Sequence, residues 1–153
     1  MEQPTEDLGT ALKSEVLGAA FFRSSYYTAL FSKHRNKLKV LWQLEVQTKQ
    51  RIIAYFQANN IEIPKLKAIA IKGSIFGIFC SIIPWHVLMK MILKETEYYL
   101  EVFHRLVKEA SEQDKELFKY IVAHEKAIAV FAEMELIDSS NQSLEVIKAL
   151  LNS

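Results

Sequence analysis

Cysteine, glycine and proline are scarce in this chain of 153 residues, and neither sign of charge predominates. The single cysteine, Cys80, excludes an internal disulfide and a zinc site built from cysteines. Four glycines and three prolines, with half of the residues apolar, exclude collagen-like repeats and a disordered linker protein. Nineteen basic residues against eighteen acidic ones leave a net charge of +1, which argues against a nucleic-acid partner. The polar, acidic segment from Met1 to Thr10 differs from a secretory or mitochondrial leader, so we expect a cytoplasmic protein.

Apolar residues recur at helical spacing along the chain, and no segment shows the sustained alternation of a strand. We therefore expect an all-α fold in a single domain, residues 1–153. The predicted helices cover about residues 8–30, 32–59, 65–83, 84–110, 111–137 and 144–151. Ser32, Pro64 and Ser111 are the local signals at three helix starts. This order predicts a four-helix bundle over 8–137, built from two helical hairpins and an apolar crossover at 65–83, with a C-terminal turn and short helix over 138–153.

The crossover has an unusual composition, because the stretch from Gly73 to Met89 contains no Asp, Glu, Lys or Arg. It is interrupted by a proline and falls short of the ~20 apolar residues that span a bilayer. Gly73, Gly77 and Ser81 recur every four residues and form a flat face that lets another helix or a lipid approach closely. Two interpretations stay open. The helix is buried across the bundle, or residues 65–89 lie on a membrane surface and contact lipid or quinone, with flanking lysines reaching the headgroups.

One glutamate interrupts the apolar stripe of each long helix, namely Glu15, Glu45, Glu97 and Glu125. An ionised carboxylate in a core costs several kcal/mol unless it is paired or binds a metal. The midpoint of Glu15 and Glu45 is residue 30, and the midpoint of Glu97 and Glu125 is residue 111. Both midpoints coincide with turns that local signals predict. Each hairpin is therefore expected to hold its two carboxylates at one depth, where oxygen donors can bridge two cations.

The segments SEVLGA (14–19), WQLEVQT (42–48) and AHEKAI (123–128) carry three of these glutamates. Together with the apolar crossover and Glu97, they resemble the ferritin-like di-iron carboxylate superfamily, and within it the demethoxyubiquinone hydroxylases of ubiquinone biosynthesis. The first segment is similar to that family's Gly-Glu-Val-Gly-Ala segment, and the other two lie where its Glu-x-x-His motifs lie. The resemblance extends over about residues 8–135.

The resemblance implies two iron ions held by the four glutamates. It also implies oxygen-dependent hydroxylation of a quinone ring that carries a lipid tail. The superfamily supplies an imidazole three residues after each motif glutamate, but this chain has Thr48 and Ile128 at those positions. A site of glutamates alone prefers iron less strongly, so manganese or no metal stays an alternative.

Three further side chains are candidate ligands. Glu101 and His104 form a Glu-x-x-His of their own, although His104 also suits a partly buried histidine near a helix end. His124 flanks Glu125 and can reach inward, although such a residue is often structural.

The leading hypothesis is therefore a hydroxylase-like di-iron monooxygenase with an altered metal site. The alternative is a catalytically silent ferritin-like relative that binds a lipid, quinone or partner protein through the crossover. A third hypothesis is a helical interaction domain whose core glutamates pair with lysines. We expect the protein to be cytoplasmic, with a peripheral position on the cytoplasmic side of a membrane as an option, and homo-oligomerisation stays open.

Overall fold

The computed structural model describes residues 2–30, 32–137 and 142–153, with side chains from residue 6 onward. Within these ranges the chain is all-helical, as the periodicity predicts, and contains no strand. The helices are α1 (Glu2–Thr28), α2 (Arg35–Ala58), α3 (Lys67–Cys80), α4 (Trp85–Glu109), α5 (Lys115–Leu136) and α6 (Ser143–Leu151). The predicted turn at 138–140 lies outside the described residues.

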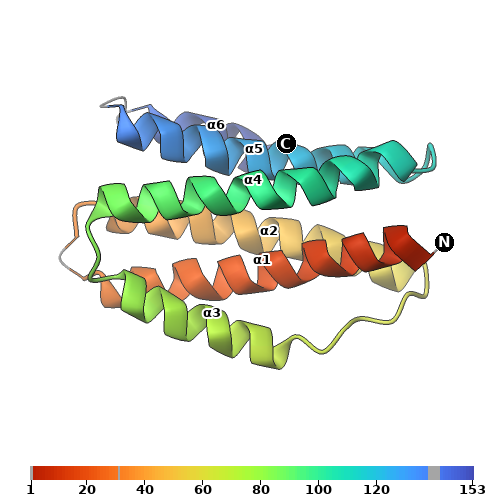
Figure 1. Ribbon diagram of the computed structural model, residues 1–153, viewed down its shortest axis with the longest axis horizontal. Coiled ribbons are helices and arrows are strands. Elements are labelled where there is room, and N and C mark those ends of the chain that lie inside the picture. Colours follow the sequence, from red (N-terminus) through yellow and green to blue (C-terminus); the bar gives the residue numbers. More distant parts are fainter. Residues whose placement is uncertain (1, 31, 138–141) are drawn as a thin grey trace.

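Helix α1 has neighbours on several sides. It packs against α2, α3 and α4, whereas α5 packs against α4, α2 and α6 (Figure 1). The pairs α1–α2 and α4–α5 are antiparallel, and α3 lies along α1 as part of the connection from α2 to α4. This arrangement buries polar side chains of α1, including Glu15 and Ser25.

Ser32, Ser111 and Pro64, which the sequence predicts to start helices, have other roles in the structure. His34, not Ser32, immediately precedes α2, and the Ser32 hydroxyl accepts a hydrogen bond from the His34 backbone N–H at 3.1 Å. The Ser111 hydroxyl donates to the Asp114 carboxylate at 2.5 Å instead of capping the backbone of α5. A hydrogen bond to a charged acceptor is stronger than one to a neutral backbone group, so the carboxylate takes the hydroxyl. Pro64 lies in the connection before α3 and not in its first turn.

The glycines of α3 pack directly on the backbone of α1. A Cβ at Gly73 would lie 2.5 Å from the Leu17 carbonyl oxygen, and one at Gly77 would lie 2.3 Å from that of Phe21. The buried Ser25 hydroxyl donates to the Gly77 carbonyl at 3.0 Å. The predicted flat face is therefore confirmed for these two glycines, and the partner that it admits is a helix.

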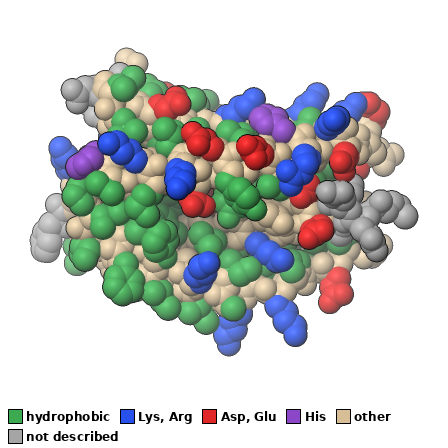
Figure 2. Space-filling model, viewed as in Figure 1, with side chains coloured by type: hydrophobic (Ala, Val, Ile, Leu, Met, Phe, Trp, Pro, Cys, Tyr) green, Lys and Arg blue, Asp and Glu red, His purple; other side chains and the backbone are tan. Residues whose placement is uncertain are grey.

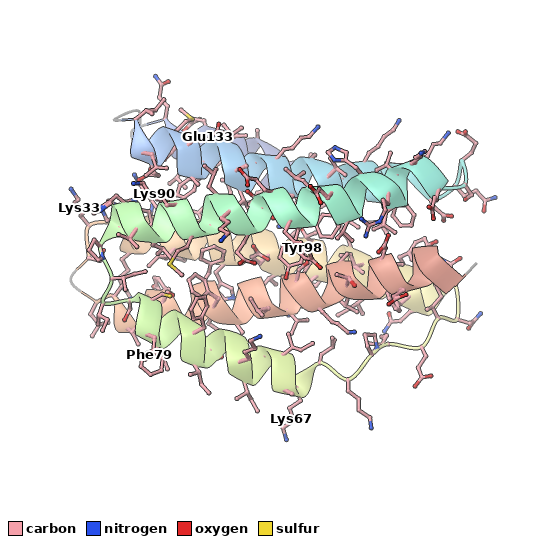
Figure 3. All side chains as sticks on the ribbon, viewed as in Figure 1. Lys33, Lys67, Phe79, Lys90, Tyr98 and Glu133 are labelled. Atoms are coloured by element: carbon pink, nitrogen blue, oxygen red, sulfur yellow. The ribbon has the colours of Figure 1, made fainter. Side chains whose placement is uncertain are left out.

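The opposite face of α3 is exposed, so the crossover is not buried within the fold. Only Gly73, Gly77 and Cys80 of this helix are buried. The exposed apolar side chains here are Ile71, Ile75, Phe76, Ile78, Phe79 and Ile82. Figure 2 shows hydrophobic side chains gathered over α3 and the start of α4, and Figure 3 shows Phe79 pointing away from the other helices. Among the described residues, no helix has the length and apolarity that crossing a bilayer requires.

Among the residues that the structure describes, the hydrophobic core forms two separate clusters. The first includes Leu12, Ile52, Phe56, Phe103 and Ile121, and the second includes Phe22, Leu41, Met89, Ile128 and Phe131. On α2 the change from one cluster to the other falls within residues 44–52, and on α5 within 122–127. The buried polar side chains Glu45, Thr48 and His124 lie within these two intervals. A polar layer therefore separates the two halves of the core.

Candidate metal centre

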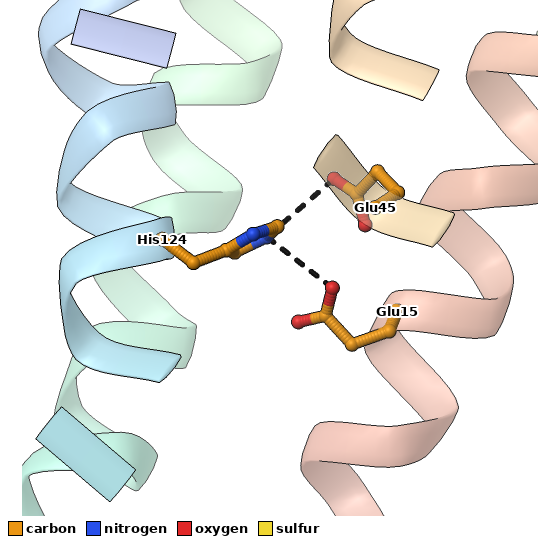
Figure 4. Close-up of side chains that lie close together, drawn as sticks. All are labelled: Glu15, Glu45 and His124. Carbon is orange, nitrogen blue, oxygen red and sulfur yellow. Dashed lines mark ion pairs between the residues drawn. The ribbon is translucent and has the colours of Figure 1, made fainter. Parts of the chain in front are cut away.

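Three helices bring two carboxylates and one imidazole together in this polar layer (Figure 4). Glu15 on α1, Glu45 on α2 and His124 on α5 each offer a ligand atom, and these atoms lie within 4.8 Å of one another. His124 Nε2 lies 3.3 Å from Glu15 Oε2 and 3.8 Å from Glu45 Oε1. All three side chains are buried. A buried group of this composition could hold a metal ion.

The carboxylate of Glu15 has an unsatisfied oxygen. Its Oε2 atom is buried and has no hydrogen-bond partner in the part of the chain that the structure describes. Its 3.3 Å approach to His124 Nε2 is therefore not an aligned hydrogen bond. Two ligand atoms at about 2.1 Å from one ion lie roughly 3.0–3.4 Å from each other. The oxygen and the nitrogen thus fit the separation of two ligands that share a cation.

Gly18 provides the space for the carboxylate of Glu45 between α1 and α2. A Cβ at position 18 would lie 2.3 Å from Glu45 Oε2 and 2.6 Å from Glu45 Cδ. Gly18 follows Glu15 by one helical turn, so both residues face the same side of α1. The local sequence of α1 therefore supplies one carboxylate and admits a second.

The second nitrogen of His124 contacts Thr48. Nδ1 of His124 lies 2.8 Å from Thr48 Oγ1, and Thr48 is 0% exposed. Thr48 follows Glu45 by one turn, so the same face of α2 contacts both the imidazole and the carboxylate cluster. The position at which the sequence lacks an imidazole is thus occupied by a hydroxyl that contacts an imidazole from α5.

Burial changes the proton affinity of each group. It raises the pKa of Glu15, and the Glu45 and Glu125 carboxylates raise that pKa further. Burial raises the pKa of Glu45 to about 8, against a hydrogen bond with Glu15 that lowers it. Burial lowers the pKa of His124 to about 3. At neutral pH without a cation, Glu45 therefore retains its proton and the imidazole is neutral, and a divalent cation that binds here releases the proton of Glu45.

A cavity of about 330 Å³ adjoins the cluster and is mostly apolar. The glutamates Glu15, Glu45 and Glu125 form part of its wall. The apolar lining comes from α1, α3, α4 and α5 and includes Phe21, Phe22, Phe76, Leu88, Met91, Ile92 and Ile128. Phe76 is 46% exposed and Met91 is 36% exposed, so the cavity borders the exposed apolar face of α3 and the first turns of α4.

The four predicted glutamates do not all meet. Glu15 and Glu45 belong to the group of three, and Glu125 is buried next to it in the cavity wall. Burial raises the pKa of Glu125, and the carboxylates of Glu45 and Glu95 raise it further. Glu97 is exposed, so the expectation that its carboxylate lies on the buried stripe of α4 is wrong.

The carboxylate of α4 that reaches the cavity is Glu95, which sequence reasoning missed. The face of α4 toward the cavity and core runs through Leu88, Ile92, Glu95, Tyr99, Phe103 and Leu106, and Glu95 on it is exposed while it borders the cavity. Residue 97 lies about 200° around the helix from residue 95, because successive residues are about 100° apart. The spacing of Glu95 from Leu88 and Tyr99 was the available signal. The flanking residues of Glu97, Leu93 and Leu100, are only half-buried.

Of the three additional candidate ligands, one belongs to the group and two do not. Glu101 and His104 are exposed on α4 and lie outside the group. His124 lies inside it, because the stripe Ile121–His124–Ile128–Phe131 faces the core of the molecule. Its neighbour Glu125 lies on the adjacent part of the same buried face, so α5 contributes two consecutive polar residues to the interior.

Comparisons of the chain with models of known families, with curated proteins and with solved structures find no match. The class of site is therefore defined by its own residues. It is a buried carboxylate–imidazole group in an all-helical protein, with a donor set that could hold a metal ion.

Proposed function

We propose that this protein is a ferritin-like four-helix bundle that binds a redox-active metal through Glu15, Glu45 and His124 and oxidises an apolar substrate. The observation that carries the proposal is the buried Glu15 Oε2, which lacks a hydrogen-bond partner and lies 3.3 Å from an imidazole nitrogen. An unsatisfied buried acceptor costs about 1–3 kcal/mol, and a bound cation removes that cost. Carboxylate and imidazole donors together suit iron and manganese.

Two more carboxylates extend the donor set toward α4. Glu125 is buried in the wall of the cavity, and Glu95 lies on the cavity side of α4. Ile128, three residues after Glu125, offers no ligand atom. A second cation at this position would therefore be held by carboxylates alone, which distinguishes it from a site that includes His124.

A metal bound here would supply the oxygen activation that characterises the superfamily the sequence resembles. The residues of the chain contribute binding, burial and proton release. Glu45 gives up its proton when a cation binds, and Glu15 and Glu45 are both buried between the two core clusters. A charge at this depth interacts more strongly with its ligands than a charge at the surface does.

The substrate that suits the site is an apolar molecule such as a quinone ring with a lipid tail. The cavity volume, about 330 Å³, is within the usual range of small-molecule sites. Its walls are mostly apolar, with Ser14, Lys94 and Thr96 as polar residues besides the glutamates, so an apolar ligand in it lies beside the carboxylate cluster. This placement supports a hydroxylase-like reaction at a ring.

The exposed face of α3 supports a membrane surface as the source of this substrate. Its apolar side chains adjoin the cavity through Phe76, and residues 65–94 contain lysines but no acidic residue. Lys67 at the start of α3 and Lys90 on α4 lie on either side of the face (Figure 3). A helix with this distribution binds an anionic lipid interface without crossing it.

Metal titration tests the proposed function. We expect protein stripped with a chelator to bind Mn²⁺, or Fe²⁺ without oxygen, and Glu15→Gln and His124→Gln to abolish tight binding. Glu97→Gln is the matched control, because this glutamate is exposed on α4, and it should bind as the wild type does. Equal affinity in wild type and Glu15→Gln would refute the metal site.

The silent relative is the second candidate, and the missing imidazole at Ile128 favours it. Such a protein would bind a lipid or quinone in the same cavity without a metal. If wild-type protein binds a quinone analogue but neither Mn²⁺ nor Fe²⁺, this result would support the silent relative and contradict the metal-dependent function.

Vesicle sedimentation tests the membrane surface separately. We expect the protein to bind vesicles of phosphatidylcholine with phosphatidylglycerol, and Phe79→Lys to weaken that binding. Val130→Lys is the control, because Val130 is a 39% exposed apolar residue on α5. Equal binding of wild type and Phe79→Lys would refute this surface.

A further inference from the structure

Thr48 and His124, which contact each other, are two of the positions at which this chain differs from the motif that it resembles: a threonine in place of the motif histidine, and a histidine on another helix. Thr48 stands where that motif has an imidazole, and the imidazole of this chain comes from α5 instead. The two side chains are 0% and 1% exposed, and Thr48 Oγ1 lies 2.8 Å from Nδ1. Water therefore does not compete for this hydrogen bond.

The two ring nitrogens of His124 face different groups. Nδ1 faces the hydroxyl of Thr48, whereas Nε2 faces the carboxyl groups of Glu15 and Glu45. A neutral imidazole carries one proton, and the nitrogen that binds a metal must be the unprotonated one. Metal binding at the carboxylates therefore requires the proton on Nδ1, and a hydroxyl oxygen can accept its hydrogen bond.

Thr48 is well suited to hold the ring in one orientation. A β-branched side chain in a helix has few rotamers, so its oxygen has a restricted position. Glu45 and Thr48 are one turn apart on α2, which fixes the hydroxyl relative to a carboxylate of the cluster. At the equivalent place after Glu125, Ile128 has no polar atom, so one of the two motif positions keeps a polar function.

We propose that Thr48 is a positioning residue, which accepts a hydrogen bond from Nδ1–H of His124 and thereby directs the unprotonated Nε2 at the metal. This inference rests on the proposed metal site. The motif has its imidazole on α2, at the position of Thr48, whereas this chain has the imidazole of His124 on α5 and uses Thr48 to orient it. Groups that orient a ligating histidine in this way commonly affect metal affinity about 10–100-fold.

The experiment compares wild type with Thr48→Val, which keeps the shape but loses the hydroxyl, and Thr48→Ser, which keeps the hydroxyl. Thr28→Val is the control, because Thr28 is exposed at the end of α1. We expect Thr48→Val to lower the affinity for Co²⁺ about 10–100-fold and Thr48→Ser to stay close to wild type. Thr28→Val should leave the affinity unchanged.

Nitrogen-15 NMR of histidine-labelled, metal-free protein at pH 6 provides a second readout. His124 is identified by the signals lost in His124→Gln. We expect Nδ1 of His124 to be protonated in wild type and in Thr48→Ser. In Thr48→Val a share of the signal should shift to the form protonated on Nε2. This readout needs no bound metal, so it separates the hydrogen bond from the metal site.

Several results would overturn the proposal. A wild-type His124 protonated on Nε2 would do so, as would an equal loss of Co²⁺ affinity in Thr48→Ser and Thr48→Val, which would indicate packing alone. If Thr48→Val does not fold, the proposal is still tested by the protonated nitrogen of His124 in wild type and by the Co²⁺ affinity of Thr48→Ser. Absence of Co²⁺ binding with Nδ1 protonated would refute the proposed function and the positioning role with it, while the hydrogen bond itself would stand.

Discussion

Replacing Glu45 by glutamine should stabilise the metal-free protein and abolish its stabilisation by metal. The carboxyl group has a pKa of about 8 in the folded chain, against 4.5 for an ordinary glutamate. At pH 7 the folded state keeps this proton and the unfolded state has released it, which favours unfolding. Over the interval from 4.5 to 7, at about 1.36 kcal/mol per pH unit, the difference is about 3 kcal/mol. A glutamine does not titrate, so Glu45→Gln should gain about this amount.

The sign of the pH dependence follows from the same pKa. A carboxyl group whose pKa is raised on folding stabilises the fold below the unfolded value, and this contribution is lost as the pH rises toward 8. The low pKa of His124 does not enter this difference, because wild type and variant carry the same imidazole and it is neutral in the folded state at both pH values. Between pH 6.5 and 8 the advantage of Glu45→Gln over wild type should therefore grow by about 2 kcal/mol.

Urea denaturation at these two pH values, with a chelator and with Mn²⁺, measures the effect. In chelator the variant should unfold at higher urea than wild type. In Mn²⁺ at 100 times Kd the advantage of the variant should shrink by about 2.7 kcal/mol, because metal binding stabilises wild type by this amount and the variant has lost a ligand. Glu97→Gln should show neither change. A variant less stable than wild type in chelator at pH 8, or an advantage that does not depend on pH, would refute the reasoning.

Two glycine substitutions give further predictions. Gly18→Ala should lower the affinity for Mn²⁺ at least about 10-fold, because its Cβ would lie 2.3 Å from Glu45 Oε2. At Gly9 a Cβ would have no atom within 4 Å, so Gly9→Ala should stabilise the fold by about 0.5–1 kcal/mol. Gly77→Ala should destabilise by about 1–3 kcal/mol in thermal unfolding, since its Cβ would meet the Phe21 carbonyl oxygen. A melting temperature of Gly77→Ala equal to that of Gly9→Ala would contradict this explanation.

The helices could be predicted from the sequence because their signals are local. Apolar periodicity and turns placed each boundary within a few residues of α2 to α6, and the predicted start at Leu8 missed only the first turns of α1. Glu15 and Glu45 were predicted together because a short connection fixes the register of two antiparallel neighbours.

The rest of the site depends on rotation of helices about their axes, which local patterns determine poorly. On α4 both Glu95 and Glu97 are exposed, and only the rotation of the helix decides that Glu95 borders the cavity. On α5 both His124 and Glu125 lie next to the same apolar residues, so only packing decides which of them meets Glu15. The support from Thr48 could not be predicted, because its partner lies on a distant helix.

The division of the core into two clusters has a consequence for how the sequence can change. The two clusters share no residue and are separated by the layer that contains Glu15, Glu45 and His124. Substitutions such as Leu12→Ala and Phe131→Ala have no common neighbours, so their effects on stability should add. Each half can therefore drift in evolution independently of the other, while the layer between them constrains both.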